Sequence, residues 1–274
     1  MAAGPDRRPA FGAGFVSDAV RYAVEGGVAT LTMDQPDNRN ALTAALLNGL
    51  ADGLAAAGAD ETVRVVVLAN TGPAFCAGAD LSAASGGQAA VAPRAGLADI
   101  LAAIQDSPKP IVARIAGHCL GGGIGLAAAC DVSIADDAAR FGFTEVRLGV
   151  APAIISVVCL PKLRRGDALE LFLSGERIPA PRAVEVGLIT RAVPAVLLDG
   201  EVAAMVTKLL AGGPGALAAA KRLVYDVPGL ERSEGFRLTT EISQARFGSA
   251  EAAEGMAAFR ERRPPAWVPP AGRG

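Results

Sequence analysis

The chain has 274 residues, which corresponds to one large domain or two small ones and is long enough to bury a sizeable core. Its composition, 51% hydrophobic and 20% charged, is too apolar for a disordered chain, and its 33 glycines follow no three-residue period, which excludes a collagen. With 26 basic and 28 acidic residues the formal charge is −2, so the chain as a whole does not attract nucleic acid or an anionic membrane. We expect a soluble globular protein that holds any anionic ligand locally.

Membrane, secretion and metal signals are weak. The charge-free stretch 115–130 is rich in glycine and shorter than the roughly 20 residues of a membrane helix. The N-terminus lacks the continuous apolar segment of a secretory signal. Four cysteines occur without a CxxC pair beside a single histidine, so we expect no metal site. These signs favour a cytoplasmic protein whose cysteines are buried free thiols: Cys76, Cys119, Cys130 and Cys159.

The N-terminal two thirds of the chain alternates strand-like and helical segments. Residues 20–24 and 28–33 are rich in β-formers around a Gly-Gly turn, which predicts a hairpin. Thr43 is a suitable N-cap for a helix with apolar residues at helical spacing, namely Leu46, Leu47, Leu50 and Leu54. The runs 65–69, 111–115 and 132–135 are typical of strands covered on both faces. Such alternation predicts a largely parallel sheet with crossover helices.

Beyond about residue 199 the pattern becomes helical only. The predicted helices span 201–210, 215–224, 232–245 and 250–263, and they could cover the sheet or pack on another subunit. The proline-rich end around Trp267 is expected to be extended or disordered. We therefore divide the chain into a flexible tail (1–19), an α/β core (20–198), a helical region (199–263) and a proline-rich tail (264–274).

Two turns rich in small residues follow predicted strands. They are residues 74–81, Ala-Phe-Cys-Ala-Gly-Ala-Asp-Leu, and residues 117–125, Gly-His-Cys-Leu-Gly-Gly-Gly-Ile-Gly. Small residues let the backbone approach a ligand, and N–H groups at a helix start carry partial positive charge. Two such turns on neighbouring strands could point two N–H donors at one developing oxyanion. Close packing of a helix on a strand accounts for either turn alone equally well.

Other enzyme classes fit these turns less well. Residues 123–128 match G-x-G-x-x-A, but Asp136 and Asp137 fall well short of the roughly 20-residue spacing of a dinucleotide site. No Lys-Ser or Lys-Thr follows the glycines, which excludes a P-loop. A serine hydrolase would need His118 as its base, yet the chain has no G-x-S-x-G, and Cys119 would point to the opposite side of an extended segment. We expect His118 to be a packed or hydrogen-bonded residue.

Between about residues 20 and 263, four motifs occur in the order and approximate spacing of one known enzyme family. They are the first turn; residues 117–123 with Ala-Cys-Asp at 129–131; Phe-Gly-Phe-Thr-Glu-Val-Arg-Leu-Gly at 141–149; and 174–178 with 187–189 and 193–194. Together they resemble the crotonase family of enoyl-CoA hydratases and isomerases. The resemblance implies an α/β, crotonase-like spiral of mainly parallel strands with covering helices. It also implies C-terminal helices that assemble a homotrimer or a dimer of trimers, and an acyl-CoA substrate with no further cofactor.

By motif position, the resemblance also implies site residues. The backbone N–H groups of Ala79 and Gly122 would form an oxyanion hole for the thioester carbonyl, and Glu145 would transfer protons. Removing one such preorganised donor typically costs about 3 kcal/mol. The implied coenzyme A contacts are Arg39, Ala41, Ala77, Ala79, Asp80, Leu81, Gly122 and Arg262. For the two arginines, solvated surface charge is the alternative.

The sequence departs from the family at one acid/base position. Hydratases of the family carry one glutamate two residues after Gly-Gly-Gly and another in the F-G-x-x-E motif, whereas this chain has Gly125 and Glu145 there. Hydration that uses two carboxylates jointly cannot run as such. Glu145 alone, in a dry pocket that raises its pKa, could still abstract and return a proton. A glutamate introduced at position 125 would supply the missing carboxylate if the neighbouring packing admits it.

Three functions remain open from the sequence. The first is an acyl-CoA hydro-lyase that adds water across a 2-enoyl-CoA double bond. The second is a Δ3,Δ2-enoyl-CoA isomerase with Glu145 as sole base, and the third is an inactive acyl-CoA binding protein. The segment around Glu145 looks like family members assigned to branched-chain hydration, which favours the first. Loop 82–94, expected to line the acyl pocket, carries no distinguishing charge and leaves the acyl chain open.

Overall fold

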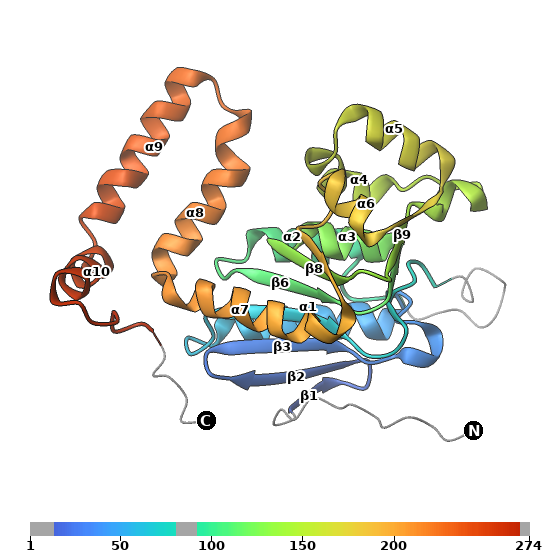
Figure 1. Cartoon of the computed structure of the whole chain (residues 1–274), viewed down its shortest axis with the longest axis horizontal. Coiled ribbons are helices and arrows are strands. Elements are labelled where there is room, and N and C mark those ends of the chain that lie inside the picture. Colours follow the sequence, from blue (N-terminus) through green and yellow to red (C-terminus); the bar gives the residue numbers. More distant parts are fainter. Residues whose placement is uncertain (1–13, 81–91, 269–274) are drawn as a thin grey trace.

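A seven-stranded sheet forms the base of the computed structural model, which describes residues 14–80 and 92–268 (Figure 1). Its strand order is β1-β2-β3-β4-β6-β8-β11. The strands are β1 Gly14–Ser17, β2 Val20–Glu25, β3 Val28–Met33, β4 Val65–Asn70, β6 Ile111–Ile115, β8 Val132–Asp136 and β11 Arg191–Val193. The first three pair antiparallel and the others pair parallel. The predicted hairpin and the three predicted apolar strands are confirmed.

A second, four-stranded sheet has the order β10-β9-β7-β5. It consists of β5 Ala74–Cys76, β7 His118–Leu120, β9 Arg140–Gly142 and β10 Arg177–Pro179. The pairs β5/β7 and β7/β9 are parallel, and β10 is antiparallel to β9. Because β5 follows β4 and β7 follows β6, the second sheet continues the chain beyond the carboxyl ends of two central strands. Both small-residue turns therefore belong to this sheet.

Between residues 44 and 185 the structure describes six α-helices. They are α1 Ala44–Ala59, α2 Leu97–Asp106, α3 Gly122–Ala129, α4 Ala153–Cys159, α5 Arg165–Ser174 and α6 Ala180–Glu185. Thr43 caps α1 as predicted, since its hydroxyl accepts a hydrogen bond from Leu46 N at 3.1 Å. Every residue of α3 is buried, which its glycines and alanines permit because they let neighbouring elements approach closely. The helix begins at Gly122, so its first four residues belong to the second small-residue turn.

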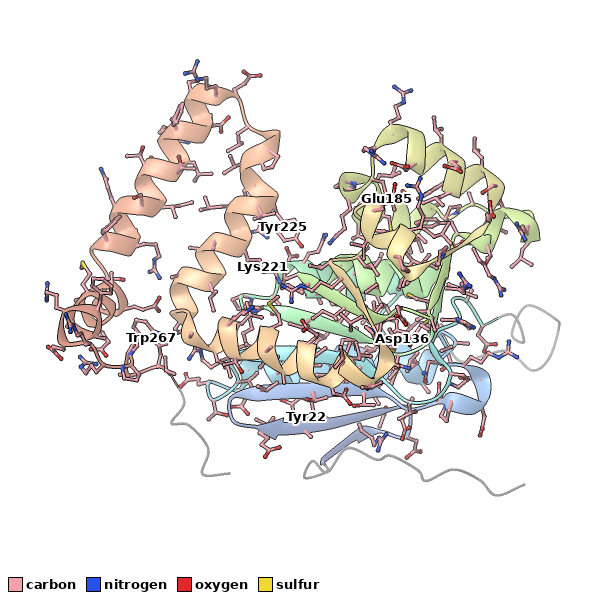
Figure 2. All side chains as sticks on the ribbon, viewed as in Figure 1. Tyr22, Asp136, Glu185, Lys221, Tyr225 and Trp267 are labelled. Atoms are coloured by element: carbon pink, nitrogen blue, oxygen red, sulfur yellow. The ribbon has the colours of Figure 1, made fainter. Side chains whose placement is uncertain are left out.

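The predicted C-terminal helices are also present, as α7 Leu198–Ala211, α8 Pro214–Asp226, α9 Arg232–Phe247 and α10 Ala250–Glu261. Helix α7 lies along the larger sheet, whereas α8 and α9 project from it and lead to α10 (Figure 1). We call residues 214–261 the arm. Lys221 anchors the arm, because its ammonium donates to Ile104 O at 2.8 Å and pairs with Asp131 at 3.0 Å (Figure 2). Lys221 is buried and Asp131 is partly buried, so this ion pair gives the arm a defined attachment to the core.

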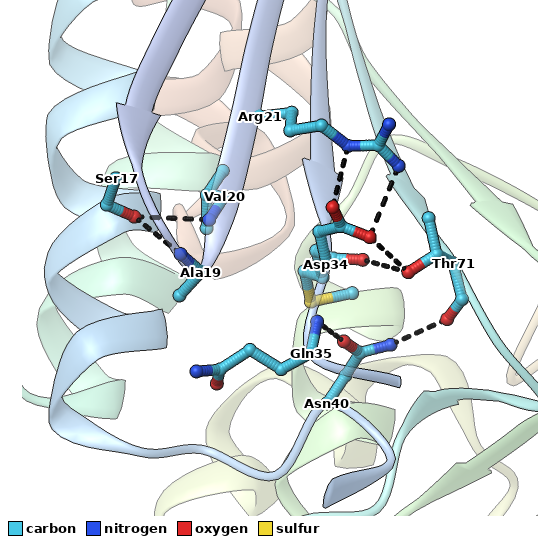
Figure 3. Close-up of polar contacts among 9 residues, drawn as sticks. Ser17, Ala19, Val20, Arg21, Asp34, Gln35, Asn40 and Thr71 are labelled. Atoms are coloured by element: carbon cyan, nitrogen blue, oxygen red, sulfur yellow. Dashed lines mark hydrogen bonds and ion pairs between the residues drawn. The ribbon is translucent and has the colours of Figure 1, made fainter. Parts of the chain in front are cut away.

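Two expectations about the chain ends need correction. Within the expected flexible tail 1–19, residues 14–17 form β1, and Ser17 Oγ accepts hydrogen bonds from the Ala19 and Val20 amides (Figure 3). At the other end, residues 264–268 return to the core: Arg64 donates to Trp267 O at 2.6 Å, and the Trp267 indole donates to Ala211 O at 3.1 Å. Pairing with β2 and these polar contacts order both segments. The four-part division of the chain stays a prediction.

Two further observations concern the cysteines and the helices. The four cysteines are buried and free, as predicted. No single helix among the described residues has the length and apolarity needed to cross a membrane. The helical segments 195–211 and 214–229 together have the length and composition of a membrane span, but they are bent by 108° where they meet.

Candidate active site

The first small-residue turn is held by the segment that precedes α1. Ala77 N donates to Arg39 O at 3.0 Å, and Leu42 N donates to Gly78 O at 2.8 Å. Leu42 and Ala79 also pair as an isolated parallel bridge. The turn therefore runs beside residues 39–42. This pairing gathers five of the sequence-predicted site residues: Arg39, Ala41, Ala77, Ala79 and Asp80.

The two turns meet at Gly78. Its φ of +88° favours glycine, and a Cβ built there would lie 3.1 Å from Leu120 O and 3.4 Å from Gly122 N. A side chain at this position would therefore push the turns apart. Over residues 14–80 and 92–268, neither the Ala79 amide nor the Gly122 amide donates a hydrogen bond to a protein acceptor. Two unused donors on adjoining turns are what binding of a single oxyanion requires.

Glu145 lies against the second turn. It sits on the 3-10 segment η3 Thr144–Leu148, which follows β9. A Cβ built on Gly121, whose φ is +52°, would lie 3.2 Å from Glu145 Oε1. The other carboxyl oxygen, Oε2, is buried and has no hydrogen-bond partner within the described part of the chain. Burial raises the pKa of Glu145 above its ordinary value of 4.5. Such a carboxyl group, lying against the turn that carries the unused Gly122 amide, is suited to accept and return a proton.

The position of the family's other glutamate is closed by hydrocarbon. Gly125 lies in α3, and a Cβ built on it would overlap Ile155 Cγ2 and lie 3.1 Å from Ile155 Cβ and 3.4 Å from Leu101 Cδ1. Ile155 on α4 and Leu101 on α2 are both buried. The packing therefore does not admit a glutamate at position 125. Restoring the missing carboxylate by Gly125→Glu requires space that this structure does not provide. The sequence did not predict that either side chain fills this position, because the pattern of α3 does not show which helices pack on it.

Two of the implied coenzyme A contacts, Leu81 and Arg262, are not among the residues gathered at the turns. Leu81 falls outside the described residues, as does most of loop 82–94. Arg262 follows α10 at the end of the arm, and Figure 1 shows α10 beyond α8, on the side away from β9. One chain alone does not bring Arg262 to the two turns. The prediction that His118 is packed or hydrogen-bonded is wrong: its side chain is exposed and makes no hydrogen bond within the described residues, because it lies at the first position of β7, where the strand begins at the protein surface.

Comparison with known proteins shows the family of the chain. The family model for enoyl-CoA hydratase/isomerase matches residues 23–269. The 2,3-dehydroadipyl-CoA hydratase of Escherichia coli K12 is 31% identical over 239 residues, which cover 87% of this chain and 94% of that protein.

Solved structures show the same likeness along nearly the whole chain. The enoyl-CoA hydratase of Mycobacterium smegmatis gives a TM-score of 0.84 at 33% identity, covering 92% of this chain and 99% of that one. The enoyl-CoA hydratase of Bacillus anthracis gives a TM-score of 0.84 at 28% identity, and the match covers 92% of this chain and 100% of that one. The predicted crotonase-like α/β fold is therefore confirmed, and the chain belongs to the enoyl-CoA hydratase/isomerase family.

Proposed function

We propose that the protein is an acyl-CoA hydro-lyase that adds water across the double bond of a 2-enoyl-CoA. The observation that carries the proposal is the close approach of the two turns at Gly78, next to the unused Ala79 and Gly122 amides, with the partly buried carboxyl group of Glu145 against Gly121. The hydratases among its relatives support the same reaction type. The substrate is carried as a coenzyme A thioester, and the proposed chemistry needs no other cofactor.

In the proposed reaction, the thioester carbonyl accepts hydrogen bonds from the Ala79 and Gly122 amides. Glu145 takes a proton from water as the water oxygen bonds to C3, and the electron pair of the double bond moves toward C2 and the carbonyl oxygen. The resulting enolate is stabilised by the two amides. Glu145 then returns the proton to C2, so that the elements of water are added and the carboxylate is regenerated. Arg39, exposed at the edge of the first turn, is proposed to meet the phosphates of coenzyme A.

Isomerisation of a 3-enoyl-CoA is the second candidate, and the hydrocarbon packing at Gly125 favours it. Moving a double bond from C3 to C2 requires removal of a proton from C2 and delivery of one to C4, which one carboxylate can perform. With Ile155 where a second carboxylate would stand, Glu145 has no acidic partner at position 125 to orient water. Hydration passes through the enolate of a 3-hydroxyacyl thioester and isomerisation through a conjugated dienolate, but both place negative charge on the thioester oxygen and would use the same two amides.

A spectrophotometric assay separates the candidates. Hydration removes the conjugation between the double bond and the thioester, so absorbance of a 2-enoyl-CoA falls. Isomerisation of a 3-enoyl-CoA creates that conjugation, so absorbance rises. We expect turnover of a 2-enoyl-CoA, tested with straight and branched short chains. Turnover of the 3-enoyl substrate alone would favour the isomerase, and binding of both without turnover would identify an inactive acyl-CoA binding protein.

We also propose that the protein assembles as a trimer or a dimer of trimers. Within the part of the chain that the structure describes, the arm leaves large apolar side chains exposed: Val224 at 71%, Phe236 at 62%, Phe247 at 73% and Phe259 at 86%. A second apolar face occupies α4 and α5, with Val157 exposed at 71% and Leu173 at 73%. Two separate apolar faces suit a head-to-tail contact, which gives a closed trimer when the rotation between neighbouring copies is about 120°.

Light scattering coupled to size exclusion should give three or six times the mass of the chain. Phe236→Glu on the arm should shift the protein to smaller species, because it places a charge in the proposed contact. Val24→Glu, which changes an exposed apolar side chain on β2, is the matched control and should leave the mass unchanged. A stable monomer at micromolar concentration would contradict the assembly.

A further inference from the structure

Two buried carboxamides converge on one backbone carbonyl behind the candidate oxyanion hole. Asn40 Nδ2 donates to Ala74 O at 2.9 Å, and Asn70 Nδ2 donates to the same oxygen at 3.1 Å. Asn40 is fully buried, and Asn70 is 7% exposed. Ala74 is the first residue of β5, the strand that leads into the first turn. We call the Asn40 and Asn70 side chains with the Ala74 carbonyl the carboxamide clamp.

Asn40 joins the clamp to the segment that pairs with the first turn. Its Oδ1 accepts from Gln35 N at 2.8 Å, and its Nδ2 also donates to Thr71 O at 3.0 Å (Figure 3). Its φ of +53° is left-handed, a conformation that asparagine adopts more readily than most residues. The preceding Arg39 carbonyl accepts the Ala77 amide. Asn40 therefore fixes the backbone against which the first turn rests.

Asn70 joins the clamp to the second turn. It ends β4, donates to Ala116 O at 2.8 Å and accepts from Ala116 N at 3.1 Å. Ala116 follows β6 and precedes Gly117, the first residue of the second turn. The Gly117 amide donates to the buried Asp136 carboxylate, and His118 N donates to Pro73 O at 3.2 Å. The starts of both turns are thus tied to one another through buried side chains and backbone.

We propose that Asn40 and Asn70 are positioning residues of the oxyanion hole, which set the separation of the Ala79 and Gly122 amides through the Ala74 carbonyl. The inference rests on the proposed function. Neither carboxamide acts on the substrate; each acts through the backbone of the turns. Preorganised donors stabilise an oxyanion only when both reach the same oxygen, and a misplacement of about 1 Å can cost about 100-fold in rate.

The test uses Asn40→Asp and Asn70→Asp, which keep the side-chain shape and remove the NH2 donors to Ala74 O. Asn48→Asp is the matched control, because Asn48 Oδ1 accepts from Arg94 N and a carboxylate can accept the same bond. We expect each clamp variant to lose about 10- to 100-fold in kcat with little change in KM. Acetoacetyl-CoA provides a readout without turnover, because an oxyanion hole favours its enolate, which absorbs in the near ultraviolet. The clamp variants should bind it with a weaker enolate signal.

The outcomes separate this inference from the proposed function. Folded clamp variants that keep the wild-type enolate signal and kcat would overturn the clamp alone. Acetoacetyl-CoA that binds the wild type without an enolate signal would overturn both the oxyanion hole and its positioning residues. A wild type that shows the enolate signal but no turnover would overturn the enzyme assignment. The clamp would then be tested by whether its variants weaken the enolate absorbance of bound acetoacetyl-CoA. If aspartate prevents folding at position 70, Asn70→Ser keeps one hydroxyl donor and should give an intermediate signal.

Discussion

Replacement of Glu145 by glutamine is expected to lower kcat on any enoyl-CoA substrate by about 100- to 10,000-fold, the range in which general acid/base groups contribute. Glutamine keeps the shape of the side chain against Gly121 but has no proton to transfer at the pH of the assay. Affinity for coenzyme A, measured by calorimetry, should stay nearly unchanged, because the carboxyl group lies at the turns and not at a basic phosphate contact.

The pH dependence supplies an independent readout of the same residue. Burial raises the pKa of Glu145 above 4.5, and the proposed base must be ionised to accept a proton. As the pH falls through this raised pKa, the fraction of active base falls, so the acidic limb of kcat/KM should lie above pH 4.5. The limb should disappear in Glu145→Gln.

Glu185→Gln is the matched control for the Glu145 variant. Glu185 is an exposed carboxylate on α6 that pairs with Arg182 at the surface, so its loss should change neither kcat nor the pH profile (Figure 2). Wild-type rates in Glu145→Gln would show that a different group carries the proton and would remove Glu145 from the mechanism.

The features that the sequence predicted are those encoded by local patterns. The hairpin 20–33, the apolar strands and the C-terminal helices each show a period or turn signal within one segment, and each was found. Strands β5, β7, β9 and β10 were not predicted. Each has three residues, too few to show a period, and each depends on pairing with residues far away in sequence.

The site was predictable only in part for the same reason. Motif order pointed to Glu145 and to both turns, but the contact between Gly78 and Gly122 N depends on how two strands pair. The clamp residues Asn40 and Asn70 carry no signal as single polar residues near turns, where asparagine is common. Their role emerges only when both side chains are seen to donate to Ala74 O.

Gly125 shows most clearly what a sequence leaves open. The sequence shows directly that the family glutamate is absent at position 125, but it does not show which side chain occupies the space. Ile155 reaches the position from α4, which lies about thirty residues further along the chain and packs on α3. Whether a carboxylate can be restored therefore depends on two helices together. We therefore expect Gly125→Glu alone and Gly125→Glu combined with Ile155→Ala to give different results.

Gly125→Glu alone is expected to destabilise the protein without a gain in hydration. Its Cβ would overlap Ile155 Cγ2, and overpacking of this kind typically costs about 1–3 kcal/mol. The added carboxylate would also be enclosed by hydrocarbon, at a further cost unless it is protonated. We expect a lower melting temperature and 2-enoyl-CoA hydration no faster than that of the wild type.

Gly125→Glu combined with Ile155→Ala is expected to behave differently. Ile155→Ala by itself leaves a cavity and typically costs about 2–5 kcal/mol, part of which the glutamate side chain should recover by filling the space. A second carboxylate could then orient water together with Glu145, and hydration of a short 2-enoyl-CoA should rise by about 100-fold or more over Ile155→Ala alone. Gly125→Gln with Ile155→Ala is the control, since it matches the size without the acid. If the glutamate variant folds but is no faster than this control, the lack of a second carboxylate does not limit hydration in this pocket. Glu145 and the two amides would then be sufficient for whatever rate the wild type achieves.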